Sequence, residues 1–413
     1  MEKTKGKRIG KKILIALGVV LGIVLIAMIF NFNRLQRLYR VINLFNSDVI
    51  VENFRTMGDK LDSRTISHGP DVFNFKRDIK KLPEKYTFNG KEKSVSSFID
   101  HSGTTGLIVI KDDTILFENY YRGNTDASKA ITWSVAKSFV SALFGIAISE
   151  GSIKDINQPV TDYLPLLKNS GYNGVSIKNV LQMSSGVRFN EDYGDFNSDI
   201  NKMGRYFALN MPLADFVASL KAERKQGTYH HYVSMDTQVL GMILREATGK
   251  NLSEYAQEKL WKPLGMESDA YWLIDGNGME AAFAGLNLTL RDYARFGRLY
   301  LKNGNWNGKQ IVPEAWVKAS VTPDAPHLIP GKRANAKWVL GYGYQWWIPE
   351  NPDGDYLAIG IYGQAIYVYP KLNIVIAKTS AYADYNKDGD DMEIESIEMF
   401  RAIARYLTKP LQL

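Results

Sequence analysis

The feature that most constrains the fold is the placement of strand-like segments at both ends of the chain, around a largely helical middle. Two β-rich runs, Leu107–Lys111 and Ile115–Tyr121, flank a short turn and predict a hairpin. The chain from Gly151 to Pro330 indicates mainly helix and loop. Late in the sequence strands are predicted again, at Tyr342–Ile348, Tyr356–Gly360, Ala365–Tyr369 and Ile374–Thr379. The simplest architecture is α/β of the α+β type. One antiparallel sheet is assembled from both chain ends and flanked by helices, with a largely helical inserted subdomain beside it.

Helices are predicted by apolar residues at helical spacing and by their end signals. Val239–Ala247 stops at Thr248-Gly249, a typical helix end. Leu290–Leu301 carries arginines on its polar side, and Glu393–Leu407 is an amphipathic helix that closes the chain.

The N-terminal region contains one uncharged apolar stretch, Ile13–Phe30, which is long enough to cross a bilayer as a helix. Six basic residues precede it and three follow closely, so the positive-inside rule predicts a cytoplasmic N-terminus and an extracytoplasmic remainder. A cleaved signal peptide is the competing interpretation. Its apolar region would be shorter and would end in a small-x-small site, whereas this stretch ends Ala27-Met28-Ile29-Phe30-Asn31. The pattern favours an uncleaved anchor.

These features divide the chain into four parts: a basic cytoplasmic tail (1–12), a transmembrane anchor (13–31), a juxtamembrane helix and stalk (32–93) and a globular domain (94–413). Within the third part, Phe32–Phe45 mixes apolar residues with three arginines and predicts an amphipathic helix at the membrane face. The following residues, 46–87, are irregular and polar, as in a stalk that wraps onto the domain.

Composition excludes several functional classes. The 413 residues include no cysteine, which rules out disulfides, thiol catalysis and cysteine-ligated zinc. The net charge is +7, but the positive charges crowd the N-terminus, where a membrane surface explains them better than nucleic acid does. No zinc-finger or aromatic RNA-binding signature is present, so a nucleic-acid partner is not expected.

A serine and a lysine stand three residues apart in Thr132–Ser138, at the head of the apolar run Phe139–Ile148. The run predicts a buried helix, because Val140, Leu143, Phe144 and Ala147 recur at helical spacing. Lys137 then lies one turn from Ser134 on the same face, within reach of its hydroxyl. A lysine desolvated against apolar walls can act as the base that makes a serine nucleophilic. A surface serine beside a snorkelling lysine is the alternative interpretation of this segment alone.

Two later stretches fit the same chemistry. Tyr232-Val233-Ser234 offers a tyrosine that could carry a proton between nucleophile and leaving group, although a core tyrosine would look the same. Ala358–Gln364 joins two late strands and contains two glycines, which allow a ligand to approach the backbone. Its strand edge also offers N–H groups to a developing oxyanion.

In this order the motifs resemble the serine β-lactamase and penicillin-binding-protein superfamily. They look most like the class C β-lactamase-related branch that includes the 6-aminohexanoate-dimer (nylon oligomer) hydrolases and related esterases. The resemblance extends over Gly106–Leu407 and includes the supporting stretches Leu181–Val187, Gly285–Asp292 and Gly341–Trp347. It implies a β-lactamase-like fold for the globular domain.

The resemblance also implies roles. Ser134 would be the acylated nucleophile, Lys137 its base and Tyr232 the relay that protonates the leaving group. The backbone N–H groups of Ser134 and Ile361 would form the oxyanion hole. Substrate contacts would come from the stretches around Asn190–Tyr193 and Ala358–Gln364, namely from Glu191, Tyr193, Gly360 and Tyr362. The partner would be a small amide or ester substrate, and neither a metal nor an organic cofactor would be needed.

Two departures affect the expected substrate. Penicillin-recognising members usually carry Lys-Thr-Gly where this chain has Ala358-Ile359-Gly360, and Tyr-x-Asn is replaced by Tyr232-Val233-Ser234. Both changes favour an amide or ester hydrolase. A cell-wall D-amino-acid peptidase, a transpeptidase or a β-lactamase remains the alternative among enzymes, and a catalytically silent binding module is the alternative from another class.

Two further patterns have simpler interpretations. His230 and His231 could supply a base, but no Gly-x-Ser-x-Gly elbow exists in the chain, so structural or substrate-rim histidines are the default interpretation. The residue types in Asp384–Glu395 match the consensus of an EF-hand calcium loop. An EF-hand loop follows a helix, however, and here a strand is expected before it. We expect a solvated acidic loop that precedes the last helix and borders the active site.

Overall fold

The structure is a computed structural model that describes residues 2–336, 338–350 and 353–409. Its main feature is an eight-stranded sheet that is antiparallel except at one edge, where β2 (Lys76–Arg77) pairs in parallel with β6 (Thr114–Tyr120). The strand order is β12-β13-β14-β15-β16-β5-β6-β2, so late strands lie against early ones. The other strands are β5 (Thr104–Lys111), β12 (Gly341–Tyr342), β13 (Trp347–Ile348), β14 (Tyr356–Gly360), β15 (Gln364–Tyr369) and β16 (Ile374–Ser380).

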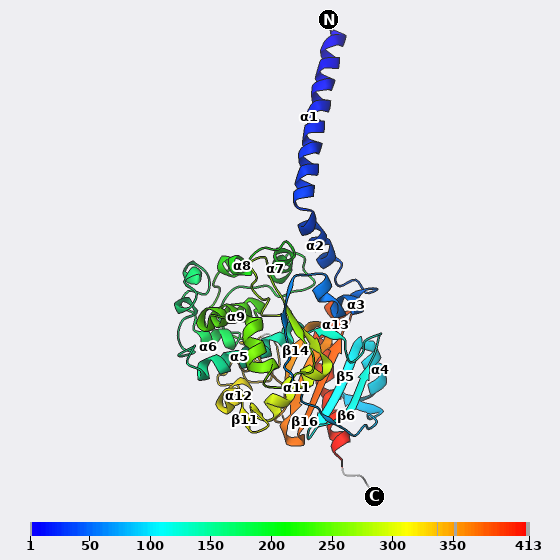
Figure 1. Ribbon diagram of the computed structural model, residues 1–413, viewed down its shortest axis with the longest axis vertical. Helices are drawn as coiled ribbons and strands as arrows, with labels where there is room; N and C mark the ends of the chain where they lie inside the picture. The colour runs from blue at the N-terminus through cyan, green and yellow to red at the C-terminus, as the bar shows by residue number, and fades with distance from the viewer. Residues whose placement is uncertain (1, 337, 351–352, 410–413) are drawn as a thin grey trace.

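Helices cover both faces of this sheet. Gly297 of α11 (Leu290–Leu301) approaches Ile366 and Val375, whereas Phe400 of α13 (Tyr385–Thr408) packs on Tyr367, with ring centroids 5.5 Å apart. Successive strand residues point to opposite faces, so Ile366 and Tyr367 place the two helices on opposite sides. This arrangement confirms the predicted fold class of an antiparallel sheet flanked by helices (Figure 1).

The middle of the chain forms a helical region beside the sheet, as predicted (Figure 1). Its principal helix, α5 (Ala136–Ser149), is almost entirely buried and packs against α9 (Ser234–Thr248), which ends at Gly249 with φ +66°. The remaining helices of this region are α6 (Ile177–Leu181), α7 (Asp199–Ala208), α8 (Leu213–Ser219), α10 (Leu252–Ala256) and α12 (Glu314–Ser320).

A second sheet was not expected inside the helical middle. It has the order β1-β8-β9-β7 and is antiparallel throughout. Its β8 (Ala270–Leu273) and β9 (Leu286–Thr289) come from the middle, β7 (Lys129–Ile131) precedes α5, and β1 (Ser63–Ile66) comes from the segment assigned to the stalk. Residues 63–93 are thus built into the globular body, which also contains the hairpin of β3 (Lys85–Phe88) and β4 (Lys91–Ser94) and the helix α4 (Val95–His101).

Two local predictions were wrong. Tyr342–Ile348 is not one strand but the two short strands β12 and β13, because Gln345 between them adopts φ +65° and reverses the chain. The acidic segment Asp384–Asp391 is not a loop, since α13 already begins at Tyr385 and is kinked at Asp388. Glu395 is the last residue of the calcium-loop pattern. Its carboxylate is bound by Lys93, 2.7 Å away, and by the Tyr86 hydroxyl.

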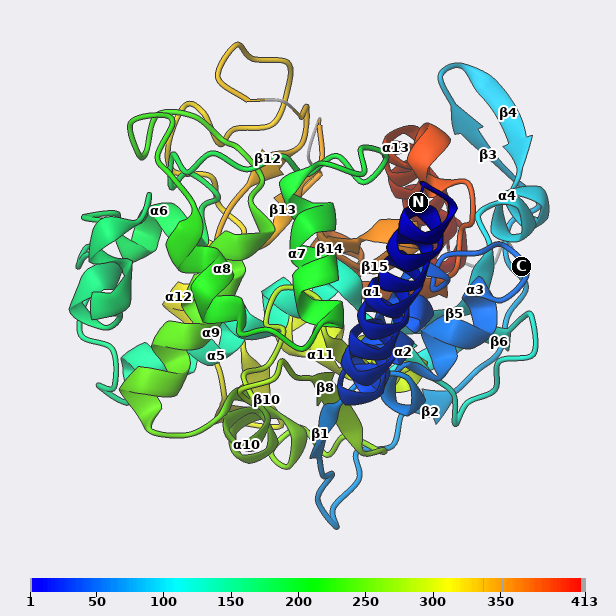
Figure 2. The ribbon, with the colours of Figure 1, turned by 90° about the horizontal axis from the view of Figure 1, so that it is seen from above.

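The N-terminal part extends away from the body. α1 (Glu2–Phe30) projects from it as a straight helix, and α2 (Phe32–Ile42) and α3 (Ile50–Arg55) lie where it meets the body (Figures 1 and 2). Residues 11–30 form one helix that is long and apolar enough to cross a membrane, and none of this stretch is buried against the protein. By length and composition it could be a membrane anchor or a signal sequence.

Candidate active site

Ser134 and Lys137 meet at the start of α5. Ser134 lies in a short 3-10 turn, Trp133–Val135, and Trp133 adopts φ +45°, a conformation uncommon for residues other than glycine. The helical spacing then directs both side chains to the same side. Lys137 Nζ lies 2.8 Å from Ser134 Oγ, and the two side chains are almost fully buried.

The surroundings of Lys137 favour its neutral form. Its amine donates to the carbonyl oxygen of Phe283 at 2.8 Å and lies 3.2 Å from Ser234 Oγ. Burial lowers the pKa of Lys137 to about 7, and the charge of the Glu191 carboxylate opposes that decrease. At neutral pH a substantial fraction of the amine is therefore unprotonated and can accept the proton of Ser134.

Tyr232 completes the group. Its hydroxyl interacts with the Ser134 side chain, and its ring stacks on Trp347 with centroids 5.3 Å apart. Lys137 Nζ lies 5.0 Å from the centre of the same ring. Desolvation, with the nearby charge of Glu191, raises the pKa of Tyr232 well above its usual value. The phenol therefore keeps its proton at neutral pH and can donate it.

Glu191 connects the loop Asn190–Tyr193 to this group through Ser234. Its carboxylate accepts hydrogen bonds from the Ser234 backbone N–H at 3.0 Å and from the Ser234 hydroxyl at 2.5 Å. It also accepts one from the Tyr193 hydroxyl at 2.8 Å. Ser234 opens α9, so the carboxylate sits at a helix N-terminus, where negative charge is favoured. Ser234 was not predicted as a site residue, although the Tyr-x-Ser motif contains it.

The turn after β14 passes close to Ser134. A methyl group on Gly360 would lie 2.4 Å from the Thr132 carbonyl oxygen and 3.2 Å from the Ser134 nitrogen. Next to it, the turn Ile361–Gly363 contains Tyr362 at φ +61°. Buried Lys378 donates to the Gly363 carbonyl oxygen at 3.1 Å and supports the turn from below. Only a glycine at position 360 allows this approach, which brings the N-terminal ends of the turn and of α5 together.

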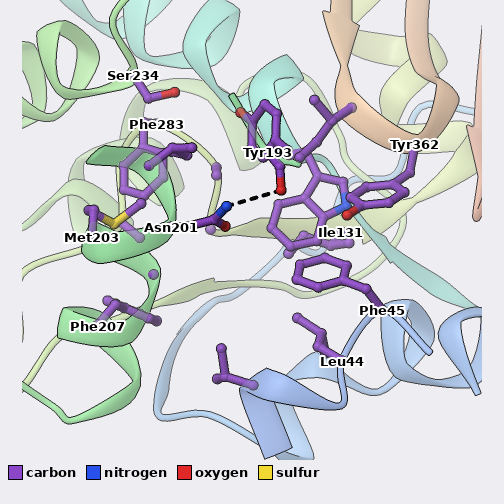
Figure 3. A pocket seen from close by; sticks show the side chains of 18 of the residues that line it. Leu44, Phe45, Ile131, Tyr193, Asn201, Met203, Phe207, Ser234, Phe283 and Tyr362 are labelled. Carbon is purple, nitrogen blue, oxygen red and sulfur yellow. Dashed lines mark hydrogen bonds between the residues drawn. The ribbon is translucent and has the colours of Figure 1, made fainter. Parts of the chain in front are cut away.

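Two cavities meet at Ser134. One, of about 400 Å³, is mainly apolar and also contains Ser234 (Figure 3). The other, of about 460 Å³, is polar, and Tyr232 lines it. Ser134, Tyr193 and Ile361 line both cavities, so the two spaces adjoin at the Ser134 hydroxyl, and each is of the size of a small-molecule site.

The two histidines line the polar cavity, but their rings contact groups other than Ser134. His231 Nε2 is 2.8 Å from the Phe189 carbonyl oxygen, which requires a proton on that nitrogen. Burial lowers the pKa of His230 to about 3, so this ring stays neutral while it packs on Tyr342 and Trp347. Their contacts favour the structural interpretation over a histidine base.

Comparisons with known proteins agree with this arrangement. The family model described as Beta-lactamase matches residues 95–397. The 6-aminohexanoate-dimer hydrolase of Paenarthrobacter ureafaciens is 30% identical over 294 residues, covering 69% of this chain and 74% of that protein. The solved structure of a Bacillus anthracis homologue of these hydrolases has a TM-score of 0.79 at 26% identity, covering 90% of this chain and 97% of that one.

A more distant structure shares the fold alone. EstCE1, described as a hydrolase with promiscuous acyltransferase activity, has a TM-score of 0.59 at 14% identity, covering 75% of this chain and 96% of that one. The predicted family resemblance is confirmed. The chain belongs to the beta-lactamase family and is a serine hydrolase, with a 6-aminohexanoate-dimer hydrolase among its relatives.

Proposed function

We propose that the protein cleaves an amide or ester bond through an acyl-enzyme formed on Ser134. The observation that carries this proposal is the 2.8 Å contact between Ser134 Oγ and the buried Lys137 amine, whose pKa is lowered to about 7. A serine hydroxyl is a weak nucleophile, and a neutral amine at hydrogen-bond distance is the base it needs.

Each step has a group to perform it. Lys137 accepts the hydroxyl proton as Ser134 Oγ attacks the substrate carbonyl carbon. The backbone N–H groups of Ser134 and Ile361 stabilise the oxyanion. Tyr232, which stays protonated and contacts Ser134, donates a proton to the departing nitrogen or oxygen, and the proton on Lys137 replaces it. Water then attacks the acyl-enzyme by the reverse route and releases the acid and Ser134.

The cleft favours substrates without a carboxylate near the scissile bond. Position 358 in β14 is alanine, and Lys378 lies under the Ile361–Gly363 turn, outside the residues that line either cavity. The carboxylates of Glu191, Asp192 and Asp391 line the polar cavity. Like charges repel, so an ester or linear amide is favoured over a D-amino-acid peptide with a free carboxylate.

The same proposal includes a location. Residues 13–31 anchor the chain in a membrane, and the basic tail 1–12 stays in the cytoplasm. The hydrolase domain 94–413 lies on the extracytoplasmic side of the membrane. The uncharged span and the basic residues before it support this topology. The mass of the chain recovered from membranes decides between an anchor and a signal sequence. A full-length mass supports the anchor, whereas cleavage after the span would contradict the proposed topology.

Labelling with a fluorophosphonate tests the catalytic proposal. Wild-type protein should be labelled and Ser134→Ala should not, while Ser149→Ala, which changes another serine of α5, should be labelled like wild type. Turnover of p-nitrophenyl acetate and the 6-aminohexanoate dimer should be lost in Ser134→Ala. Preferred hydrolysis of nitrocefin or a D-Ala-D-Ala peptide would support the cell-wall or β-lactamase alternative. Absence of labelling in folded wild-type protein would support the silent binding module.

A further inference from the structure

The apolar cavity beside Ser134 has two main walls from different parts of the chain. One wall is α7, which contributes Ile200, Met203 and Phe207. The opposite wall is the segment that follows α2, with Leu44 and Phe45 (Figure 3). Further apolar lining comes from Ile131, Leu273 and Phe283. A cavity of this size with hydrocarbon walls suits an alkyl chain, because its walls offer a polar ligand few partners.

Tyr232 decides which half of a substrate enters which cavity. It lines the polar cavity and not the apolar one. Since Tyr232 protonates the leaving group in the proposed mechanism, that group must depart into the polar cavity. The acyl part that stays on Ser134 then extends into the apolar cavity. Acidic side chains of this cavity, among them Glu191, Asp192 and Asp391, outnumber its lysine, Lys387, and therefore favour a leaving group that is neutral or cationic.

The helix α2 turns its apolar side outward, whereas an ordinary surface helix buries its apolar side. Its buried contact is polar: Arg37 pairs with Asp62, donates to the Ala208 carbonyl oxygen at 3.3 Å and lies over the Phe207 ring. A stripe of apolar residues at spacings of three and four faces outward instead, with each side chain 44–69% exposed, at Phe32, Leu35, Tyr39 and Ile42. An outward apolar stripe is expected where a helix lies on a membrane.

This stripe connects the candidate anchor to the apolar cavity. α2 begins two residues after Phe30, the end of the apolar span, and its last residues, Val41 and Ile42, already line the cavity. Eleven helical residues span only about 16 Å. If residues 11–30 cross the membrane, the length of α2 therefore limits the distance between the bilayer and the cavity wall to about 16 Å.

Resting on the function proposed above, we infer that the substrate is a fatty-acyl ester or amide resident in the membrane, with a neutral or cationic head group. The acyl chain occupies the apolar cavity while the head group lies in the polar one. Ser134 Oγ bonds to the acyl carbon, the bond to the head group breaks, and the head group leaves with a proton from Tyr232. Water then releases the fatty acid.

Gly204 provides a direct test, because it lines the cavity and an added side chain there would meet nothing within 4 Å. The full-length protein in phosphatidylcholine vesicles is assayed with p-nitrophenyl acetate, butyrate, octanoate and dodecanoate. For wild type, kcat/KM should rise about fourfold per methylene until the cavity is filled. Gly204→Leu, which fills the cavity, should lower the ratio of dodecanoate to acetate hydrolysis at least tenfold. Comparing variants in the same vesicles cancels substrate partitioning.

The matched control is Lys202→Leu, which adds a leucine on the exposed side of the same helix and should keep the wild-type ratio. An unchanged ratio in Gly204→Leu, or wild-type kcat/KM that falls with chain length, overturns the inference. If Gly204→Leu fails to fold, labelling of the wild-type protein provides the test instead. Faster labelling by decyl than by ethyl fluorophosphonate supports the inference, and equal or slower labelling by the decyl probe overturns it. Failure of the proposed function is a different result, the absence of any Ser134-dependent turnover of acetate.

Discussion

The ring of Phe45 stacks on the ring of Tyr362, with centroids 5.1 Å apart and planes inclined by 12°. Phe45 belongs to the segment that follows α2, and Tyr362 to the turn that carries the proposed oxyanion donor Ile361. Trp133, the residue before Ser134, lies 5.7 Å from the same Phe45 ring. The segment that follows α2 therefore packs directly against both backbone elements of the proposed oxyanion hole.

Phe45→Ala should weaken catalysis more than folding. An aromatic pair contributes about 0.5–1.5 kcal/mol, so loss of this contact should lower kcat/KM for p-nitrophenyl acetate by about two- to tenfold. Phe45 is 38% exposed, and the melting temperature should change little. Val49→Ala, a similarly exposed change in the same segment, is the control and should retain wild-type kinetics. Equal kinetics for the two variants would show that the packing of Phe45 on Tyr362 does not support catalysis.

Replacing Lys137 should separate activity from stability. Lys137→Met removes the base and should lower kcat by about 10²- to 10⁴-fold. It also removes an ionisable group from the interior, so the melting temperature at pH 7 should be unchanged or higher. Lys137→Arg keeps the charge but cannot lose its proton, and it should be inactive too. Substantial activity in a folded Lys137→Arg protein would exclude Lys137 as the base.

The pH dependence of kcat/KM should follow the titration of Lys137. The protonated amine cannot accept the Ser134 proton, so activity should rise with pH through an inflection near 7 and level off above it. Because the pKa of Tyr232 is raised, the tyrosine should add no descending limb up to pH 9. A bell-shaped profile in this range would contradict these assignments.

Glu191→Gln tests the cause of the Lys137 pKa. The Glu191 carboxylate stabilises the ammonium form, so its removal should move the inflection to lower pH. Asp192→Asn, which neutralises an exposed neighbour in the same loop, is the matched control and should move the inflection less. An inflection displaced to higher pH in Glu191→Gln would mean that another group is being titrated.

Local patterns predicted the parts of the fold and site that depend on neighbours in sequence. The Ser134–Lys137 contact follows from helical spacing, and the Leu290–Leu301 helix has the predicted bounds. The link from Glu191 to Ser234 could not be foreseen from spacing, because it joins segments 43 residues apart through tertiary packing.

The wrong predictions have similar causes. Gln345 reverses the chain with φ +65°, which is uncommon for a glutamine. Its side chain is held there by the Thr237 hydroxyl, which donates to Oε1, and by the Leu181 carbonyl oxygen, which accepts from Nε2. No short-range pattern marks that turn. Likewise, the four-residue strand β1 gains its partner β8 only in the folded chain, so no strand was predicted in this segment.

Gly360→Ala tests whether the close approach of β14 to Ser134 matters for catalysis. The new methyl group would lie 2.4 Å from the Thr132 carbonyl oxygen, so the strand or the turn before α5 must shift. Overpacking of this kind costs about 1–3 kcal/mol, and the shift should also displace the oxyanion donors. We expect kcat to fall at least tenfold and the melting temperature to fall by several degrees.

The control is Gly69→Ala, where the added methyl group makes ordinary contacts with Lys262 at 3.5 Å and should leave kinetics unchanged. Fluorophosphonate labelling of Gly360→Ala then separates two explanations. Slow labelling of a folded protein indicates a displaced oxyanion hole, because the probe's developing charge needs the same donors. Labelling at the wild-type rate would show that the approach of Gly360 serves packing alone, and Ile361 would lose its proposed role.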